Sequence, residues 1–235
     1  MYKEFSEVYD LVYSSIDYKK ACKKLSKLIK KYKRSPGNKL LDVACGTGTH
    51  LFYLQHNFTC TGLDINADML EIARKKVENA SFVQADMITM NLNEKFDVIT
   101  CLFSSIGYSK TYENLRKTIN NFSTHLNSGG LVVIEPWLEQ SIYHEGHISM
   151  TTYDGDDIKI ARLNTTGLKD VLSTMEMHYL MLKKGENVKY FKDYHELGLF
   201  NTEKTLEIMN RANLEGKSFK KGLMVERGLI LGVKK

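Results

Sequence analysis

No apolar run in the 235-residue sequence is long enough to cross a bilayer, and the first residues lack the hydrophobic region of a secretory signal. None of the four cysteines stands in a C-x-x-C pair, and all fall on or beside apolar segments: Cys22, Cys45, Cys60 and Cys101. Such positions are typical of buried, reduced thiols rather than of disulfides or a metal site. We therefore expect a cytoplasmic protein with no membrane partner and no bound metal.

Positive charge is concentrated in one early segment. The net charge is +5, and nine of the 16 residues from 19 to 34 are Lys or Arg. Apolar residues such as Cys22, Leu25 and Ile29 recur there at helical spacing, which predicts an amphipathic helix with a basic, solvated face. Attraction of an anionic substrate or of nucleic acid is the alternative. No interleaved aromatic residues of the kind that bind single strands accompany the charges, so we expect no nucleic-acid partner.

The glycine-rich segment from Asp42 to Gly48 lacks the marks of two nucleotide-binding motifs. A dinucleotide-binding turn has the pattern G-x-G-x-x-G, but Leu51 stands at the third glycine position. No G-K-[S/T] closes the segment, which excludes a P-loop. What remains is D-x-A-x-G-x-G between a strand pattern and a helix pattern, where glycine allows a ligand to approach the backbone.

Acidic residues also follow two later strand patterns. Asp64 ends the pattern at 58–63, and Asp86 ends the one at 81–85. Each alone also fits a turn or a helix cap, but their order at strand–helix spacing predicts one shared site, because open α/β sheets bind ligands at the carboxyl ends of their strands. A carboxylate at Asp64 can accept hydrogen bonds from both hydroxyls of a ribose.

The rest of the chain divides into a few segments. Strand and helix patterns alternate from residue 39 to about 137, which predicts a mainly parallel sheet. Residues 1–35 form two helical patterns, which we interpret as an N-terminal lid. From 143 to 195 apolar and polar residues alternate, which predicts an inserted antiparallel β meander that caps the site or makes a dimer contact. A final hairpin is expected at 217–233, within a single domain that spans 1–235.

The D-x-A-x-G-x-G pattern resembles motif I of class I S-adenosylmethionine (SAM) methyltransferases. This resemblance implies a Rossmann-like α/β fold with a seven-stranded sheet that ends in an antiparallel hairpin. It also implies SAM as the cofactor, with S-adenosylhomocysteine as its product. The residues that it places at the cofactor are Tyr13, Asp42, Ala44, Gly46, Gly48, Asp64, Ile65, Met69, Asp86, Met87 and Phe103.

Further stretches resemble a narrower family, the bacterial N,N-dimethyltransferases of nucleotide-linked amino sugars, which methylate dTDP-amino-deoxyhexoses of the desosamine and mycaminose type. They include VYDLVY at 8–13, LDVACGTGTHL at 41–51, FSSIGY at 103–108, EPW at 135–137 and DYH at 193–195. The chain departs from that family at Leu138, at Asp64, where the family often has Glu, and at 224–226. The last departure bears on the identity of the substrate more than on the chemistry.

Methyl transfer to an amine requires a neutral lone pair, so an ammonium acceptor must first lose a proton. The resemblance implies that Tyr13 orients the amine or contacts the cofactor and that His125 lies near the acceptor. A packing role for Tyr13 and a helix-end role for His125 are the alternatives. His195 is a further possible pocket residue, and the candidates for acceptor binding are Ser105, Tyr108, Trp137, Arg162, His178 and Arg227, of which the arginines suit phosphate oxygens.

The leading hypothesis is a SAM-dependent N-methyltransferase that acts on a small-molecule amine, in particular the amino group of a nucleotide-linked amino-deoxysugar. The alternatives are a methyltransferase for another small metabolite and a SAM-binding protein without catalysis. An RNA methyltransferase is disfavoured, because Phe103-Ser104-Ser105-Ile106 stands where a [D/N]-P-P-[Y/F] motif is expected. A homodimer formed through the β insertion is a further expectation.

Overall fold

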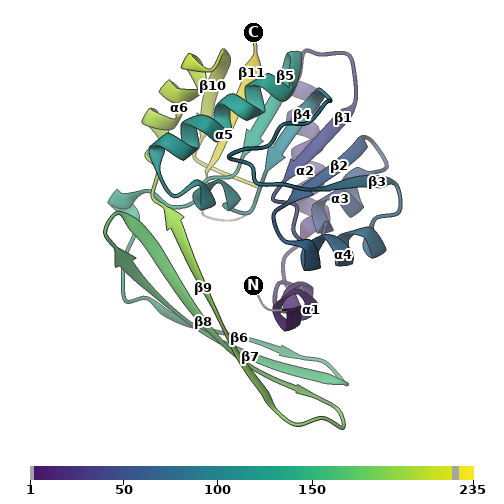
Figure 1. Cartoon of the computed structure of the whole chain (residues 1–235), viewed down its shortest axis with the longest axis vertical. Coiled ribbons are helices and arrows are strands. Elements are labelled where there is room, and N and C mark those ends of the chain that lie inside the picture. Colours follow the sequence, from purple (N-terminus) through teal and green to yellow (C-terminus); the bar gives the residue numbers. More distant parts are fainter. Residues whose placement is uncertain (1–2, 224–227) are drawn as a thin grey trace.

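The computed structural model describes residues 3–223 and 228–235, without the side chains of residues 3–5 and 7. Two β-sheets of different topology form two layers (Figure 1). The larger sheet lies in the upper part of Figure 1 and the smaller one below it. Helix α1 (Lys3–Val12) lies beside the space between them.

The larger sheet has seven strands in the order β10-β11-β5-β4-β1-β2-β3. Strands β1 to β5 pair in parallel, whereas β11 is antiparallel to both β5 and β10. This confirms the predicted Rossmann-like fold with its C-terminal antiparallel hairpin. The strands are β1 (Lys39–Val43), β2 (Thr59–Asp64), β3 (Ala80–Gln84), β4 (Phe96–Cys101), β5 (Leu126–Ile134), β10 (Leu214–Phe219) and β11 (Leu229–Lys234).

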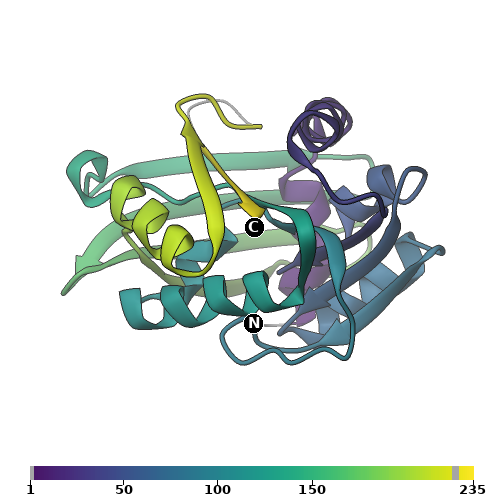
Figure 2. The same cartoon turned by 90° about the horizontal axis from the view of Figure 1, so that it is seen from above.

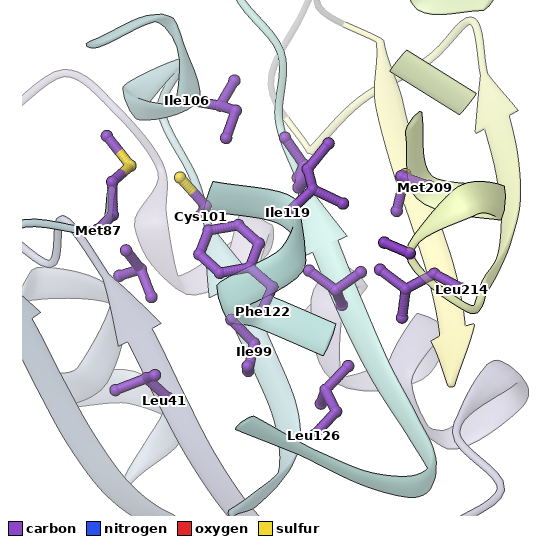
Figure 3. Close-up of a cluster of buried hydrophobic side chains, with 14 of the residues drawn as sticks. Leu41, Met87, Ile99, Cys101, Ile106, Ile119, Phe122, Leu126, Met209 and Leu214 are labelled. Atoms are coloured by element: carbon purple, nitrogen blue, oxygen red, sulfur yellow. The ribbon is translucent and has the colours of Figure 1, made fainter. Parts of the chain in front are cut away.

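The central strands are mostly apolar because both of their faces are buried. Successive residues alternate between two hydrophobic clusters, as Val98 and Ile99 of β4 do. Figure 3 shows the cluster that contains Ile99, with Phe122 and Met209 packed over the strands. All four cysteines are free and buried, as the sequence predicts.

Helices cover both faces of the larger sheet (Figure 2). The basic segment forms the predicted amphipathic helix, which buries Cys22, Leu25 and Ile29 against one face. The helices are α2 (Tyr18–Tyr32), α3 (Thr49–Leu54), α4 (Ala67–Lys76), α5 (Tyr112–His125) and α6 (Thr202–Arg211), with short 3₁₀ helices η1 (Ser105–Ser109) and η2 (Gln140–Ile142). None of the helices in the described part of the chain has the length and apolar character that crossing a membrane requires.

The smaller sheet is the inserted antiparallel meander that the alternating pattern predicts. Its strands pair in chain order: β6 (Ile148–Asp154), β7 (Ile158–Lys169), β8 (Leu172–Lys183) and β9 (Lys189–Gly198). The meander therefore extends three residues beyond the predicted end at 195. Its inner face forms a third hydrophobic cluster in which Ile160, Tyr179 and Met181 pack with Val8 and Val12 of α1.

Helix α1 also bonds to the larger layer. The hydroxyl of Thr47 and the ammonium of Lys76 both donate to the carboxylate of Asp10, over 2.6 Å and 2.5 Å. These contacts fix α1 over the glycine-rich turn that follows β1. Of the two helices expected in an N-terminal lid, α1 lies between the layers, whereas α2 packs on the larger sheet beside α3.

Candidate active site

A cavity of about 1280 Å³ lies between the carboxyl ends of the parallel strands and the inner face of the smaller sheet. Gly46, Asp64 and Asp86 line it at the carboxyl ends of β1, β2 and β3, Tyr13 lines it from directly after α1, and Arg162 lines it from the smaller sheet. Pockets for one small ligand typically measure about 300–1000 Å³. The cavity therefore has room for a cofactor and a second molecule.

The turn after β1 is built from residues in the left-handed region. Ala44, Gly46 and Gly48 have φ values of 57°, 55° and 74°. At Gly48 a side chain would also be too close to α4, since a Cβ there would lie 3.1 Å from the Cβ of Ala73. Glycine is thus required at this position for the packing of α3 on α4, and Gly48 does not line the cavity.

The carboxylate of Asp64 joins this turn to the end of β2. Its Oδ2 accepts the backbone N–H of Gly46 over 2.8 Å, and its Oδ1 accepts that of Asn66 over 2.9 Å. Burial raises the pKa of Asp64, and these backbone donors oppose the increase. An ionised carboxylate has about four acceptor positions, and Asp64 lines the cavity. It therefore retains acceptor capacity for the hydroxyls of a ligand.

Asp42 lies deeper, under the same turn. The hydroxyl of Thr100 donates to its Oδ1 over 2.6 Å. Burial raises the pKa of Asp42 to about 7, the Thr100 hydrogen bond opposes this, and the nearby charge of Asp64 adds to it. Asp42 lines a smaller cavity of about 40 Å³, together with Gly46 and His50. Burial lowers the pKa of His50 to about 4, so that the imidazole is neutral near pH 7.

The end of β4 is held in an unusual backbone conformation. Phe103 and Ser104 are consecutive non-glycine residues with φ values of 53° and 66°. The N–H of Phe103 donates to Glu135 over 3.0 Å, and the hydroxyl of Ser104 donates to the carbonyl of Pro136 over 2.9 Å. Strained backbone of this kind persists only where the surroundings determine it. The EPW segment thus positions the FSS segment, including Phe103 and Ser105, at the cavity wall.

On the side of the smaller sheet, Arg162 and Tyr13 form a pair. Arg162 Nη1 donates to the Tyr13 hydroxyl over 2.9 Å, and its Nη2 donates to Thr151 over 3.0 Å. Its buried Nε makes no hydrogen bond with the described residues. The ring of Tyr13 also meets that of Phe103 edge-on, with centroids 5.1 Å apart. These contacts join α1, β7 and the end of β4 at the cavity.

Most of the predicted site residues line the large cavity, but four of the described ones do not: Asp42, Gly48, His125 and His178. Ile65, Met69, Met87, Tyr108 and Trp137 all line the large cavity. Arg227 lies outside the described residues.

The expected role of His125 beside the acceptor requires correction. His125 ends α5 and precedes β5, so it lies at the amino end of a parallel strand, whereas the cavity lies at the carboxyl ends. It is buried, its Nε2 accepts the N–H of Leu92 over 2.8 Å, and its Nδ1 donates to the carbonyl of Asn121 over 2.7 Å. Both ring nitrogens are engaged with the backbone, which is a structural role.

The expected place of His178 in the acceptor pocket also requires correction. Its side chain is on the outer face of β8, where Nδ1 lies 2.6 Å from the Tyr190 hydroxyl and Nε2 lies 2.8 Å from Glu176. Asp193, which the DYH stretch includes but which was not predicted as a site residue, lines the cavity instead, as does His195. They stand two residues apart on β9, and the period-2 alternation of that strand was the signal for their shared face.

Comparisons with known proteins agree with this geometry. A family model described as a methyltransferase domain matches residues 40–130. The dTDP-3-amino-3,4,6-trideoxy-alpha-D-glucopyranose N,N-dimethyltransferase of Streptomyces venezuelae is 35% identical over 98% of this chain and 98% of its own. The dTDP-3-amino-3,6-dideoxy-alpha-D-glucopyranose N,N-dimethyltransferase of Streptomyces fradiae is 31% identical over 98% of this chain and 91% of its own. The crystal structure of Streptomyces venezuelae DesVI matches with a TM-score of 0.91 at 34% identity, over 97% of this chain and 98% of that one.

The parallel sheet, the turn after β1 and the acids at the strand ends define a class I methyltransferase that uses SAM as its methyl donor. Within that class, the chain belongs to the family of the two Streptomyces N,N-dimethyltransferases. The relationship covers nearly the whole chain, including the smaller sheet.

The raised pKa of Asp42 predicts a pH-dependent stability. The folded pKa of about 7 lies above the unfolded value of 3.8, so the unfolded chain releases this proton first as the pH rises. The contribution of Asp42 to stability is therefore complete below about pH 3.8 and declines until about pH 7. Each pKa unit corresponds to about 1.4 kcal/mol. From about pH 3.8 to about pH 7, the free energy of unfolding of Asp42→Asn should therefore rise by up to about 4 kcal/mol relative to that of wild type.

Urea unfolding of the ligand-free protein at about pH 4.5, 6 and 7.5 measures this difference. Asp97→Asn is the control. Burial raises the pKa of Asp97, but hydrogen bonds from the Lys39 N–H and the Asn127 side chain help to lower it overall. Its effect on stability therefore changes only below the measured range. If the free energies of unfolding of wild type and Asp42→Asn changed in parallel with pH, the raised pKa of Asp42 would be contradicted.

Proposed function

We propose that this enzyme transfers methyl groups from SAM to the amino group of a nucleotide-linked amino-deoxysugar. The observation that carries the proposal is the composition of the large cavity. One wall consists of the strand ends and the turn of a nucleoside-binding sheet, and the other is the antiparallel sheet that extends over the same site. The two Streptomyces relatives, which are named for dTDP-amino sugars, match the chain along both walls.

The cofactor occupies the wall of the larger sheet in this proposal. Asp64 accepts the ribose hydroxyls, and the left-handed turn exposes its backbone to the amino-acid part. Asp86, whose Oδ1 already accepts the N–H of Ile88 over 2.8 Å, lies near the adenine. Bound SAM supplies a methyl group on a positively charged sulfur. The residues assigned to this half are Tyr13, Asp42, Ala44, Gly46, Asp64, Ile65, Met69, Asp86, Met87 and Phe103, with Gly48 acting through packing.

The acceptor occupies the wall of the smaller sheet. Tyr13 and Phe103, in edge-on contact, close the space between the two halves and exclude water from it. Ser105, Tyr108 and Trp137 border the acceptor, and Arg162 offers its unpaired Nε to a substrate oxygen. Holding the amine in line with the methyl group supplies up to about 7–11 kcal/mol of the barrier reduction through proximity alone. We propose that α1 and the smaller sheet act together as the cap on this cavity.

Mass spectrometry of reactions with SAM tests the acceptor. We expect products heavier than the substrate by one and then two methyl groups with dTDP-3-amino-deoxyhexoses, because two rounds of transfer give a dimethylamine. A panel should include the 4-amino isomers, the corresponding 3-hydroxy sugars and simple amines. Methylation of simple amines, with no nucleotide sugar converted, would contradict the proposed substrate class.

The outer face of the smaller sheet supports a homodimer. Several large apolar side chains on it are more than two-fifths exposed, and their cross-strand pairs make them contiguous, as Met150 with Leu163 and Leu180 with Tyr190. Apolar patches of this kind mark protein contacts. We propose that a second copy of the chain covers this face. A stable interface buries roughly 800 Å² of each partner.

Analytical ultracentrifugation tests this contact. Wild type should sediment as a dimer, and Leu163→Asp with Leu180→Asp should sediment as a monomer, because two charges would be buried without partners. Phe52→Asp is the matched control, since Phe52 is an exposed apolar residue on α3. A monomeric wild type at micromolar concentration would exclude the dimer.

A further inference from the structure

Three side chains on the wall of the large cavity form a connected series. The hydroxyl of Tyr108, on η1, lies 2.7 Å from Nδ1 of His195, on β9. The other ring nitrogen of His195, Nε2, lies 2.9 Å from Oδ2 of Asp193. The side chains of His195 and Asp193 are only 8% and 9% exposed. Tyr108 retains 39% of its surface, and because it lines the cavity, this surface is open to a bound acceptor.

The contacts of His195 determine where its proton lies. The carboxylate of Asp193 beside Nε2 favours a proton on that nitrogen, which leaves Nδ1 as an acceptor. The Oδ2 of Asp193 receives no well-aligned hydrogen bond from the described residues. Asp193 therefore acts mainly through its charge. Its Oδ1 accepts the N–H of Tyr194 over 3.0 Å, which fixes the carboxylate.

Tyr108 is the donor in its contact with His195. Burial raises the pKa of Tyr108 above its ordinary value, and the neighbouring Tyr13 and Asp193 add to this, so the phenol is protonated. When its proton points to Nδ1 of His195, the lone pairs of the phenol oxygen are left for another donor. An ammonium group in the cavity is such a donor.

We propose that Tyr108, His195 and Asp193 form a proton relay that deprotonates the acceptor ammonium before each methyl transfer. The inference rests on the proposed function, because it requires an amine acceptor. One N–H bond of the ammonium breaks and its proton forms a new O–H bond on Tyr108. The original phenol proton passes to Nδ1 of His195, and the resulting imidazolium lies beside the carboxylate of Asp193. The amine is left with a neutral lone pair, and no electron transfer occurs.

In this relay Tyr108 is the catalytic residue, and His195 and Asp193 act through it. The arrangement follows the logic of a nucleophile, an imidazole and an orienting carboxylate. Dimethylation requires the relay twice, since the monomethylated product is again an ammonium. His195 therefore has to release its proton between the two rounds.

Other ionisable groups face the relay and contribute to its pH dependence. Tyr13 after α1, Asp64 of β2 and Tyr179 of β8 all act on Tyr108 electrostatically. Arg162 of β7 lines the same cavity and bonds to Tyr13. Glu196 follows His195 but is paired with Lys110 and Lys169, and it does not line the cavity.

The alternative is that the contact between Tyr108 and His195 has only a structural role and stabilises the packing of β9 against η1. A relay and a structural contact predict different effects of pH on the rates of the variants. Without the relay, the enzyme depends on acceptor molecules that are already neutral in solution, and their fraction rises tenfold for each pH unit below the pKa of the amine. Loss of a purely structural contact would lower the rate by the same factor at every pH.

The experiment measures kcat and KM from about pH 6 to about pH 9.5 for wild type, Tyr108→Phe, His195→Gln and the double variant. At about pH 7 each single variant should lose about 10²–10⁴ in kcat, the usual contribution of general acid–base catalysis. This deficit should narrow as the pH rises. The double variant should lose little more than either single variant, because residues that act as a unit are not additive.

His178→Gln is the matched control. His178 also lies between a tyrosine hydroxyl and a carboxylate, Tyr190 and Glu176, but on the outer face of the sheet and away from the cavity. Its pH profile should match that of wild type. Binding of S-adenosylhomocysteine, measured by calorimetry, should be unchanged in every variant, which separates loss of the relay from loss of the fold.

Two kinetic results would overturn the relay. One is a His195→Gln rate within about threefold of wild type at pH 7. The other is a deficit that stays constant over the whole pH range. A wild type that methylates no amino-sugar nucleotide would contradict the proposed function instead, and the variants would then be compared on whichever amine is methylated.

Nitrogen-15 NMR of ligand-free protein gives a readout that needs no turnover. His195 should carry its proton on Nε2 in wild type, and Asp193→Asn should reduce the population of that tautomer. A proton on Nδ1 in wild type would contradict the relay whatever the substrate is.

Discussion

The site depends on the two backbone hydrogen bonds that the carboxylate of Asp64 accepts. The carboxylate accepts the N–H of Gly46 from the turn after β1 and the N–H of Asn66 at the start of α4. Without it, the left-handed turn would leave backbone donors unpaired in a largely buried place, which costs about 1–3 kcal/mol per group. The same carboxylate faces the cavity. One side chain thus shapes the turn and, in the proposed function, offers acceptors to the cofactor.

The second sheet turns an open strand edge into an enclosed site. A bare α/β sheet leaves its ligand crevice open on one side. Here α1 packs its apolar face into the meander and bonds through Asp10 to Thr47 and Lys76. The layers are therefore held at a fixed separation, and the cavity between them is large enough for two molecules. This enclosure brings residues of the smaller sheet, such as Arg162 and His195, to the wall of the same cavity.

Much of the fold could be predicted from the sequence because its signals are local. Continuous apolar strands, the period-2 meander and the acid after each early strand all identified their elements. His125 shows where this reasoning ends. A histidine at the end of a helix can lie at either edge of the sheet, and only the topology places it at the edge opposite the cavity. Likewise, alternation could have placed His195 and Asp193 on one face of β9, but not beside Tyr108, which is 87 residues away in the chain.

Calorimetry of S-adenosylhomocysteine binding tests most directly the claim that Asp64 holds the cofactor. Asp64→Ala removes the acceptor for the ribose hydroxyls and for two backbone donors, and each hydrogen bond to a charged group contributes about 1.5–3 kcal/mol. Its affinity should fall at least about tenfold. Asp68→Ala is the control, since Asp68 is an acid in the first turn of α4 that does not line the cavity, and it should bind as wild type does. An unchanged affinity in Asp64→Ala would contradict the central role assigned to this carboxylate.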